Sequence, residues 1–234
     1  MVLSVVATLL VVAAVVLVAR DERGGDPPTA APLDLDIAEL EGALLTAADV
    51  GSGYTDSFDD GDDGDDELAP EDFDASPECL EAIDRFESTS AGDEGIDAGF
   101  ESGDLTEVDH QIALVQEGDP GIAELQAALE DCESIAFDDG ESQGEMRFQT
   151  EPVDGLGEAA VAVTTQVELT VDGVPVTADI YSIYWSRGGV ASSVAMSVLD
   201  SSLIGGTQDA ELDRELVREL ADTADQKLDG VLAG

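Results

Sequence analysis

The chain has 234 residues, 43% of them hydrophobic, which suits one domain of ordinary size with a real core. Asp and Glu total 55 against 8 Lys and Arg, giving a formal net charge of −47. This charge argues strongly against nucleic-acid binding, which needs basic side chains on phosphates, and against docking on anionic lipid head groups. The charge indicates instead an acidic surface that keeps the protein soluble in a salty medium. We expect this surface to have no function of its own.

The N-terminus begins with an uncharged apolar run at 2–19. This run would form about 27 Å of α-helix, close to the roughly 30 Å hydrocarbon core of a bilayer. We expect residues 1–19 to be an uncleaved signal-anchor helix; the alternative is a signal peptide whose cleavage releases a secreted protein. No Cys follows the run, which excludes a lipoprotein anchor, and Leu17 makes a poor cleavage site.

The flanking charges conflict with an exported domain. Arg20 and Arg23 follow the run and no basic residue precedes it, so the positive-inside rule alone would keep the domain in the cytoplasm. Asp21 and Glu22 lie among these arginines, and a basic leader upstream would reverse the rule. We give more weight to the chemistry of the domain and expect it on the extracytoplasmic side of the cell membrane.

A Pro/Gly-rich linker at 20–34 is expected to precede a domain at 35–234. Leu35, Ile37, Leu40, Leu44 and Leu45 fall on one face of a predicted helix that ends at Gly51. An acidic, disordered loop is predicted at about 56–72.

The stretch "DDGDDGDDE" at 59–67 has the composition of a calcium loop without its spacing. An EF-hand loop needs oxygen ligands at positions 1, 3 and 5, Gly at 6 and Glu at 12. With Gly64 at position 6, position 3 is Gly61 and position 12 is Pro70; with Gly61 at position 6, position 3 is Phe58. We predict a solvated loop without a metal site; weak, non-specific divalent binding is the alternative.

Two helices and a strand are predicted next. A short helix at 76–86 would start at Ser76 as N-cap, and a longer helix at 119–137 would follow the Asp119 cap. The apolar positions of the longer helix are Ile122, Leu125, Leu129, Cys132 and Ala136. Between the two helices, Val108, His110, Ile112 and Leu114 alternate along one face of a strand.

The second half of the chain is predicted to be mostly strand. Asp-Gly at 172–173 and "RGG" at 187–189 are hairpin turns joining three strands of a C-terminal meander. The alternating apolar residues are Val161, Val163, Val167, Leu169, Val176, Ile180, Tyr184, Val190, Val194, Met196 and Val198. An amphipathic helix at 211–228 closes the chain, with Leu212, Leu216, Leu220, Ala224 and Leu228 on one side. The predicted fold class is α+β, an antiparallel sheet flanked by helices.

Cys79 and Cys132 are the only cysteines, and each lies on the inner face of a predicted helix. In an exported domain such a pair is expected to form one disulfide, which contributes roughly 2–4 kcal/mol in the chain-entropy model. Two buried free thiols are the alternative. A catalytic thiol would have only His110 as its base, and one His with two distant Cys gives no zinc spacing. No metal and no cofactor are therefore predicted.

No catalytic residue is assigned. His110 is expected to be a hydrogen-bonded core or edge residue, and Tyr181, Tyr184 and Trp185 are expected to pack in the core rather than line a groove. The sequence contains no nucleophile elbow, P-loop or dinucleotide fingerprint. Among 55 acidic residues a pair of carboxylates carries no signal.

Five stretches resemble the actinobacterial PknH-like extracellular (sensor) domain family. They are "LLTAADVGSGYT" at 44–55, the cysteine segments "PECLEAI" and "EDCESIAF", "GLGEAAVAV" at 155–163, and the closing "ELVRELADTADQKL". The resemblance covers about 35–230. It implies an extracytoplasmic α+β domain of Mog1/PsbP-like shape that senses or binds something in the cell envelope. The chain departs from the family's kinase sensor in having no kinase domain, one cysteine pair instead of two, no lipobox and a longer acidic loop.

These observations favour a non-catalytic, membrane-anchored extracytoplasmic domain that senses or binds an unknown envelope ligand or protein. One alternative is an envelope scaffold that binds another protein, which would show an exposed apolar patch. A second is a hydrolase with two carboxylates roughly 5–9.5 Å apart in a cleft. A small-molecule binder would instead show an apolar pocket.

Overall fold

A computed structural model of the chain describes residues 37–57, 73–76, 79, 95–103, 106–115, 121–130, 132, 134–138, 142–171, 174–201 and 212–233. The predicted anchor at 1–19 and linker at 20–34 lie outside these residues, as do 58–72 of the predicted acidic loop. Within the described ranges, no helix is long and apolar enough to span a membrane.

The described elements comprise a 3₁₀-helix, three α-helices and the strands of one sheet. In chain order they are η1 (Ile37–Ala43), α2 (Ala47–Val50), β1 (Tyr54–Ser57), β2 (Phe73–Asp74), β3 (Gly95–Ser102), β4 (Thr106–Leu114), α4 (Ile122–Glu130), β5 (Ser134–Asp138), β6 (Ser142–Pro152), β7 (Ala159–Val171), β8 (Val174–Arg187), β9 (Val190–Ser201) and α5 (Arg214–Leu232).

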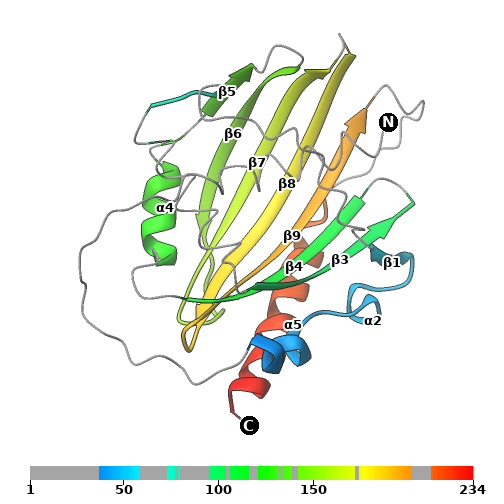
Figure 1. Cartoon of the computed structure of the whole chain (residues 1–234), viewed down its shortest axis with the longest axis vertical. Coiled ribbons are helices and arrows are strands. Elements are labelled where there is room, and N and C mark those ends of the chain that lie inside the picture. The colour runs from blue at the N-terminus through cyan, green and yellow to red at the C-terminus, as the bar shows by residue number, and fades with distance from the viewer. Residues whose placement is uncertain are drawn as a thin grey trace.

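The sheet of the described residues has nine antiparallel strands in the order β1-β3-β4-β9-β8-β7-β6-β5-β2 (Figure 1). The predicted three-stranded meander is confirmed: it is β7-β8-β9, in the middle of the sheet. Val171 pairs with Val174, so the ends of β7 and β8 are adjacent, as the predicted hairpin requires. Gly188 and Gly189 form the next turn at φ +58° and +81°, a region that favours glycine. The α+β fold class is therefore confirmed.

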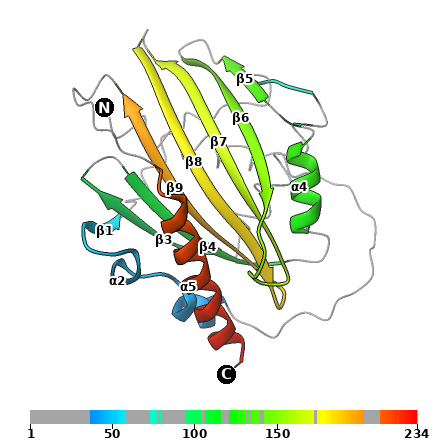
Figure 2. The ribbon, with the colours of Figure 1, turned by 180° about the vertical axis from the view of Figure 1, so that it is seen from behind.

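Helix α5 packs on one face of the sheet, with η1 and α2 beside it (Figure 2). Its predicted apolar stripe is confirmed, since Leu220, Ala224 and Leu228 are all buried. The helix runs from Arg214 to Leu232 rather than over 211–228, because the Asp213 side chain caps it by accepting hydrogen bonds from the first-turn N–H groups.

On the opposite face, α4 packs against β6 and β7 (Figure 1). Ile122, Leu125 and Leu129 are buried there, as their spacing predicted. Beside α4, a second cluster surrounds the two cysteines. Its members are Cys79, Cys132, Ile135, Phe137, Met146, Val167, Leu169, Val176 and Ala178.

The single helix predicted up to Gly51 is wrong. The segment is divided into η1 and the short α2, with an extended stretch between them. The break places the Leu45 N–H within 3.0 Å of His110 Nδ1, and Thr46 begins a capping box with Asp49. A contact to a residue far along the chain therefore overrides the helical periodicity.

The long helix predicted at 119–137 is also wrong in its second half. Helix α4 ends at Glu130, and Ser134–Asp138 is strand β5. Ile135 and Phe137 are buried while Ala136 between them is exposed, which is the period of a strand. The helix ends just before Cys132, whose disulfide holds the chain against the sheet.

Three smaller corrections concern the predicted loops and ends. Asp56 and Ser57, assigned to the acidic loop, lie in β1. Strands β3 and β6 were not predicted; β6 alternates too weakly, since Gln, Glu, Arg and Gly interrupt its apolar residues. Of the helix predicted at 76–86 only Ser76 and Cys79 are described, and the Cys79 N–H donates to Ser76 Oγ at 3.1 Å, as an N-cap requires.

Candidate functional site

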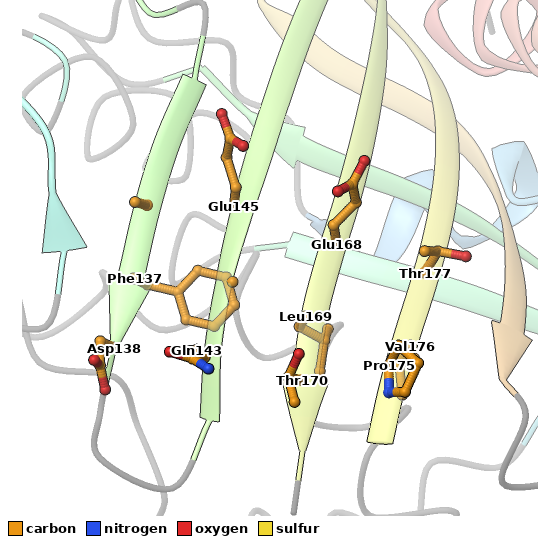
Figure 3. A pocket seen from close by; sticks show the side chains of 12 residues that line it. Phe137, Asp138, Gln143, Glu145, Glu168, Leu169, Thr170, Pro175, Val176 and Thr177 are labelled. Carbon is orange, nitrogen blue, oxygen red and sulfur yellow. The ribbon is translucent and has the colours of Figure 1, made fainter. Parts of the chain in front are cut away.

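An open groove of about 600 Å³ crosses β5 to β8 on the α5 side of the sheet (Figure 3). Thr177 and Tyr181 lie four residues apart on β8 and therefore face the same side. Tyr181 is buried in the α5 cluster whereas Thr177 is exposed, so the helix stops short of the groove. We call this the β5–β8 groove. Its lining residues are Ala136, Phe137, Asp138, Gln143, Gly144, Glu145, Glu168, Leu169, Thr170, Pro175, Val176 and Thr177.

Beneath the groove, on the opposite face of the sheet, Phe137 packs against Gly144, its partner across β5 and β6. A Cβ atom at Gly144 would lie 2.6 Å from Phe137 Cζ and 2.5 Å from the Glu168 carbonyl oxygen. The absence of a side chain at Gly144 therefore lets the Phe137 ring lie across β6. The floor of the groove is the backbone of β5 to β8, and most side chains on the groove face are polar.

The walls carry charges of both signs. Glu145 and Glu168 face each other across β6 and β7, and Arg147 contacts both, at 2.7 and 3.2 Å. Gln166 donates to Asp179 at 3.0 Å next to them. All three members of the arginine bridge are more than one-third exposed, so the pairing orders the wall without contributing much stability.

A second polar cluster lies between the groove and the start of α5. The Tyr181 hydroxyl donates to Glu151 at 2.8 Å, Arg218 donates to the same carboxylate, and the Arg214 guanidinium lies 5.0 Å from the Tyr181 ring centre. The hydrogen bond from Tyr181 lowers the pKa of Glu151, with Arg218 adding to the effect. Burial raises the pKa of Tyr181. This cluster lies where α5 stops covering β8 and the exposed face of the sheet begins.

A smaller groove of about 470 Å³ lies between α2 and the strands β1 and β3. Thr46 and Ala47 form one side, and Asp56 and Phe100 lie on the other. Gly99 permits its close packing, since a Cβ atom there would lie within 3 Å of the Ser57 hydroxyl. Its floor is short, and the polar residues that line it are Thr46, Asp56, Ser57 and Asp97, so the β5–β8 groove is the larger candidate.

His110 is fully buried in β4 and satisfied on both ring nitrogens, as predicted. Nδ1 accepts from the Leu45 N–H, so the proton lies on Nε2, which is 3.1 Å from Ser192 Oγ. Ser192 in turn donates to the Gln111 carbonyl oxygen. Burial lowers the pKa of His110 to about 3, and Lys227 adds to the effect. The residue is a structural hydrogen-bond bridge, neutral at ordinary pH.

The other residues singled out in the sequence are also structural. Trp185 and Tyr181 pack under α5, and Tyr184 packs against the α4 side of the sheet, so the core interpretation is correct. Cys79 and Cys132 are bonded to each other, with a Cα–Cα distance of 5.2 Å. In the described ranges, no group of three or more His, Cys, Asp or Glu side chains could hold a metal ion. The stretch at 59–67 lies outside those ranges.

Sequence reasoning missed an ion pair that fixes α5 to the end of β8. Arg187 Nε donates to Asp225 at 2.6 Å and Nη2 to the other oxygen at 2.5 Å, and the Gly157 N–H contacts the same carboxylate at 3.4 Å. Asp225 is only 6% exposed. The hydrogen bond to Asp225 raises the pKa of Arg187. The one signal in the sequence was the position of Asp225, an acidic residue on the apolar face of the predicted helix, four residues after Ala221.

Comparisons with known proteins give distant structural similarity. No family model and no curated protein matches the chain. The extracellular domain of PknH from Mycobacterium tuberculosis is 13% identical, with a TM-score of 0.47, over 84% of this chain and 98% of that one. An uncharacterized protein from Mycobacterium smegmatis is 16% identical, with a TM-score of 0.39, over 84% and 93%.

Proposed function

We propose that this chain is an extracytoplasmic, membrane-anchored domain of the cell envelope that binds a ligand in the β5–β8 groove without catalysing a reaction. The anchor is the apolar run at 1–19. The distant likeness to the PknH extracellular domain agrees with this proposal, but the argument depends on the residues of this chain.

The observation that carries the extracytoplasmic location is the disulfide. Cys79 and Cys132 are bonded and are 4% and 1% exposed. Disulfides form and persist in oxidising compartments and are rare in the cytoplasm. The pair crosslinks positions 53 residues apart, and such a loop stabilises a fold by roughly 2–4 kcal/mol. The domain therefore gains this stability only where the thiols are oxidised.

The groove supports binding because its face of the sheet joins a little apolar surface to several polar side chains. Ala136 and Pro175 supply the apolar surface, while Thr170, Thr177 and Gln143 supply hydrogen-bonding groups. Pockets of several hundred Å³ that join apolar area to a few placed polar groups are typical of small-molecule sites. A scaffold is less favoured, because Val115 is the one exposed large hydrophobic residue among those described.

A non-catalytic role agrees with the environment of the groove carboxylates. A glycosidase needs one carboxylic acid kept protonated by apolar surroundings. Glu145 and Glu168 instead share the Arg147 guanidinium and are exposed to solvent. Two solvent-exposed carboxylates beside an arginine do not have the apolar surroundings that such an acid needs.

Native mass spectrometry of the full chain, purified from an actinobacterial host, tests the binding role. We expect a stoichiometric added mass that is absent from Thr177→Trp, which fills the groove, and present in Thr55→Trp. Thr55 is the matched control because it is also an exposed strand residue, in β1 at the far edge of the sheet. An added mass retained by both variants would contradict binding in this groove.

A further inference from the structure

At one end of the domain, several half-buried apolar side chains lie near the one large hydrophobic residue that is exposed among those described. Val115 is 39% exposed and is the one large hydrophobic residue classed as exposed among those described. Ile37, Leu114, Val231 and Leu232 are half-buried and pack against one core cluster near it. We call these five residues the apolar end.

The β8–β9 hairpin brings the members of this end together. The Val115 N–H donates to the Gly189 carbonyl oxygen at 3.0 Å. On the other side of the turn, a Cβ atom at Gly188 would lie 3.2 Å from Leu232 Cδ1. Both ribbon views place η1, this hairpin and the last turn of α5 at the same end of the molecule (Figures 1 and 2).

The chain also enters the domain at this end. Ile37 is the first described residue and belongs to the apolar end. Residues 20–36 separate it from the predicted anchor, and a chain of that length spans at most about 60 Å. A tether this short holds the surface next to Ile37 at a high effective concentration near the bilayer. Even a weak contact with lipid is then sufficient to keep this surface on the membrane.

We propose that the apolar end rests on the lipid surface to which residues 1–19 anchor the chain, an inference that depends on the anchor in the proposed function. Apolar side chains enter the boundary between head groups and acyl chains, which favours this end over the acidic remainder. Glu41 and Asp229 are exposed near it, so the surface it fits is zwitterionic rather than anionic. The β5–β8 groove then faces away from the membrane.

Fluorescence quenching by nitroxide-labelled lipid measures this orientation. The full chain, reconstituted in phosphatidylcholine vesicles, carries one fluorophore at Val115→Cys or at Ala233→Cys, a second exposed position at the same end. The control is Thr177→Cys, ten residues before Arg187 on β8 and therefore about 30 Å away along the strand. The native cysteines are bonded to each other, so only the introduced thiol reacts.

We expect quenching at positions 115 and 233 to exceed quenching at 177 at least twofold. Equal quenching at all three positions, or the strongest quenching at 177, would overturn the inference and leave the anchor standing. Failure of the full chain to float with the vesicles would overturn the anchor and this inference with it. Flotation is measured on the same samples, which separates the two failures.

Discussion

His110 lies parallel to Trp185, with ring centroids 6.2 Å apart and ring planes 8° apart, and both rings are fully buried. The two residues come from β4 and β8, which are separated in the sheet by β9. Through the Leu45 N–H, His110 also fixes the break between η1 and α2. The contact therefore links the first described segment of the chain to the centre of the sheet.

Neutral His110 makes stability depend on pH. Its pKa is about 3 in the folded protein and 6.5 in the unfolded chain, so the unfolded state binds more protons between these values. Its contribution is fully present above pH 6.5 and is lost progressively as the pH falls toward 3. We expect the difference in unfolding free energy between wild type and His110→Gln to shrink by about 1 kcal/mol per pH unit between pH 6 and 4.

Urea unfolding followed by the fluorescence of Trp185, the single tryptophan, measures this difference directly. The carboxylates titrate in both proteins, so their effect cancels in the comparison. A difference in unfolding free energy that stays constant from pH 7 to pH 4 would show that His110 does not titrate as described.

The Arg187–Asp225 pair is expected to be the costliest ion pair to break. Removing one partner leaves a buried charge without compensation, which costs about 3–5 kcal/mol. Arg187→Gln leaves the 6% exposed Asp225 carboxylate without its partner and should therefore lower the unfolding free energy by about 3–5 kcal/mol, as measured by chemical denaturation. Asp229→Asn is the control: Asp229 also contacts Arg187 but its side chain is 67% exposed, so a change below about 1 kcal/mol is expected. Equal losses in the two variants would contradict this account.

Gly144 is expected to tolerate no side chain. Gly144→Ala would place its methyl group against the Phe137 ring and the Glu168 carbonyl oxygen, and we expect a loss of about 1–3 kcal/mol in unfolding free energy. Gly103→Ala is the matched control, because Gly103 has no positive φ and a Cβ atom there would meet nothing within 4 Å. Similar stability of the two variants, measured by thermal unfolding, would show that Phe137 is not packed against Gly144 as described.

The net charge of −47 predicts stabilisation by salt. Like charges also face each other within the sheet, as Glu101 does Glu107 across β3 and β4, and such pairs are destabilising. The Debye length falls from about 10 Å at 0.1 M salt to about 3 Å at 1 M, which screens this repulsion. We expect the melting temperature to rise by several degrees over this range at pH 7 and by less at pH 4. A melting temperature independent of salt would contradict the prediction.

The sequence predicted the fold wherever local pattern and tertiary structure agree. Val161, Val163 and Val167 alternate on β7, and Leu220, Ala224 and Leu228 repeat on α5; all six are buried. The pattern misled where a distant partner decides the conformation. Leu45 leaves the helix to reach His110, and Ile135 turns inward on a strand that begins after the Cys132 disulfide.

The candidate site could not be predicted because it consists of residues from four strands whose register the sequence does not encode. Asp138, Gln143, Thr170 and Pro175 form one row across β5 to β8 only in the observed pairing. Glu145 and Glu168 are two carboxylates among many, and only the cross-strand position of Arg147 distinguishes them. The cysteines were predictable because they are the only two in the chain.

The measurement that tests the central claim most directly is the accessibility of the domain in protoplasts of an actinobacterial host that produces the full chain. We predict that a protease added outside intact protoplasts removes the domain. We also predict that maleimide-polyethylene glycol labels Cys79 and Cys132 only after denaturation and reduction. A domain that is digested only after lysis, with two thiols that react upon denaturation without reductant, would contradict an extracytoplasmic location.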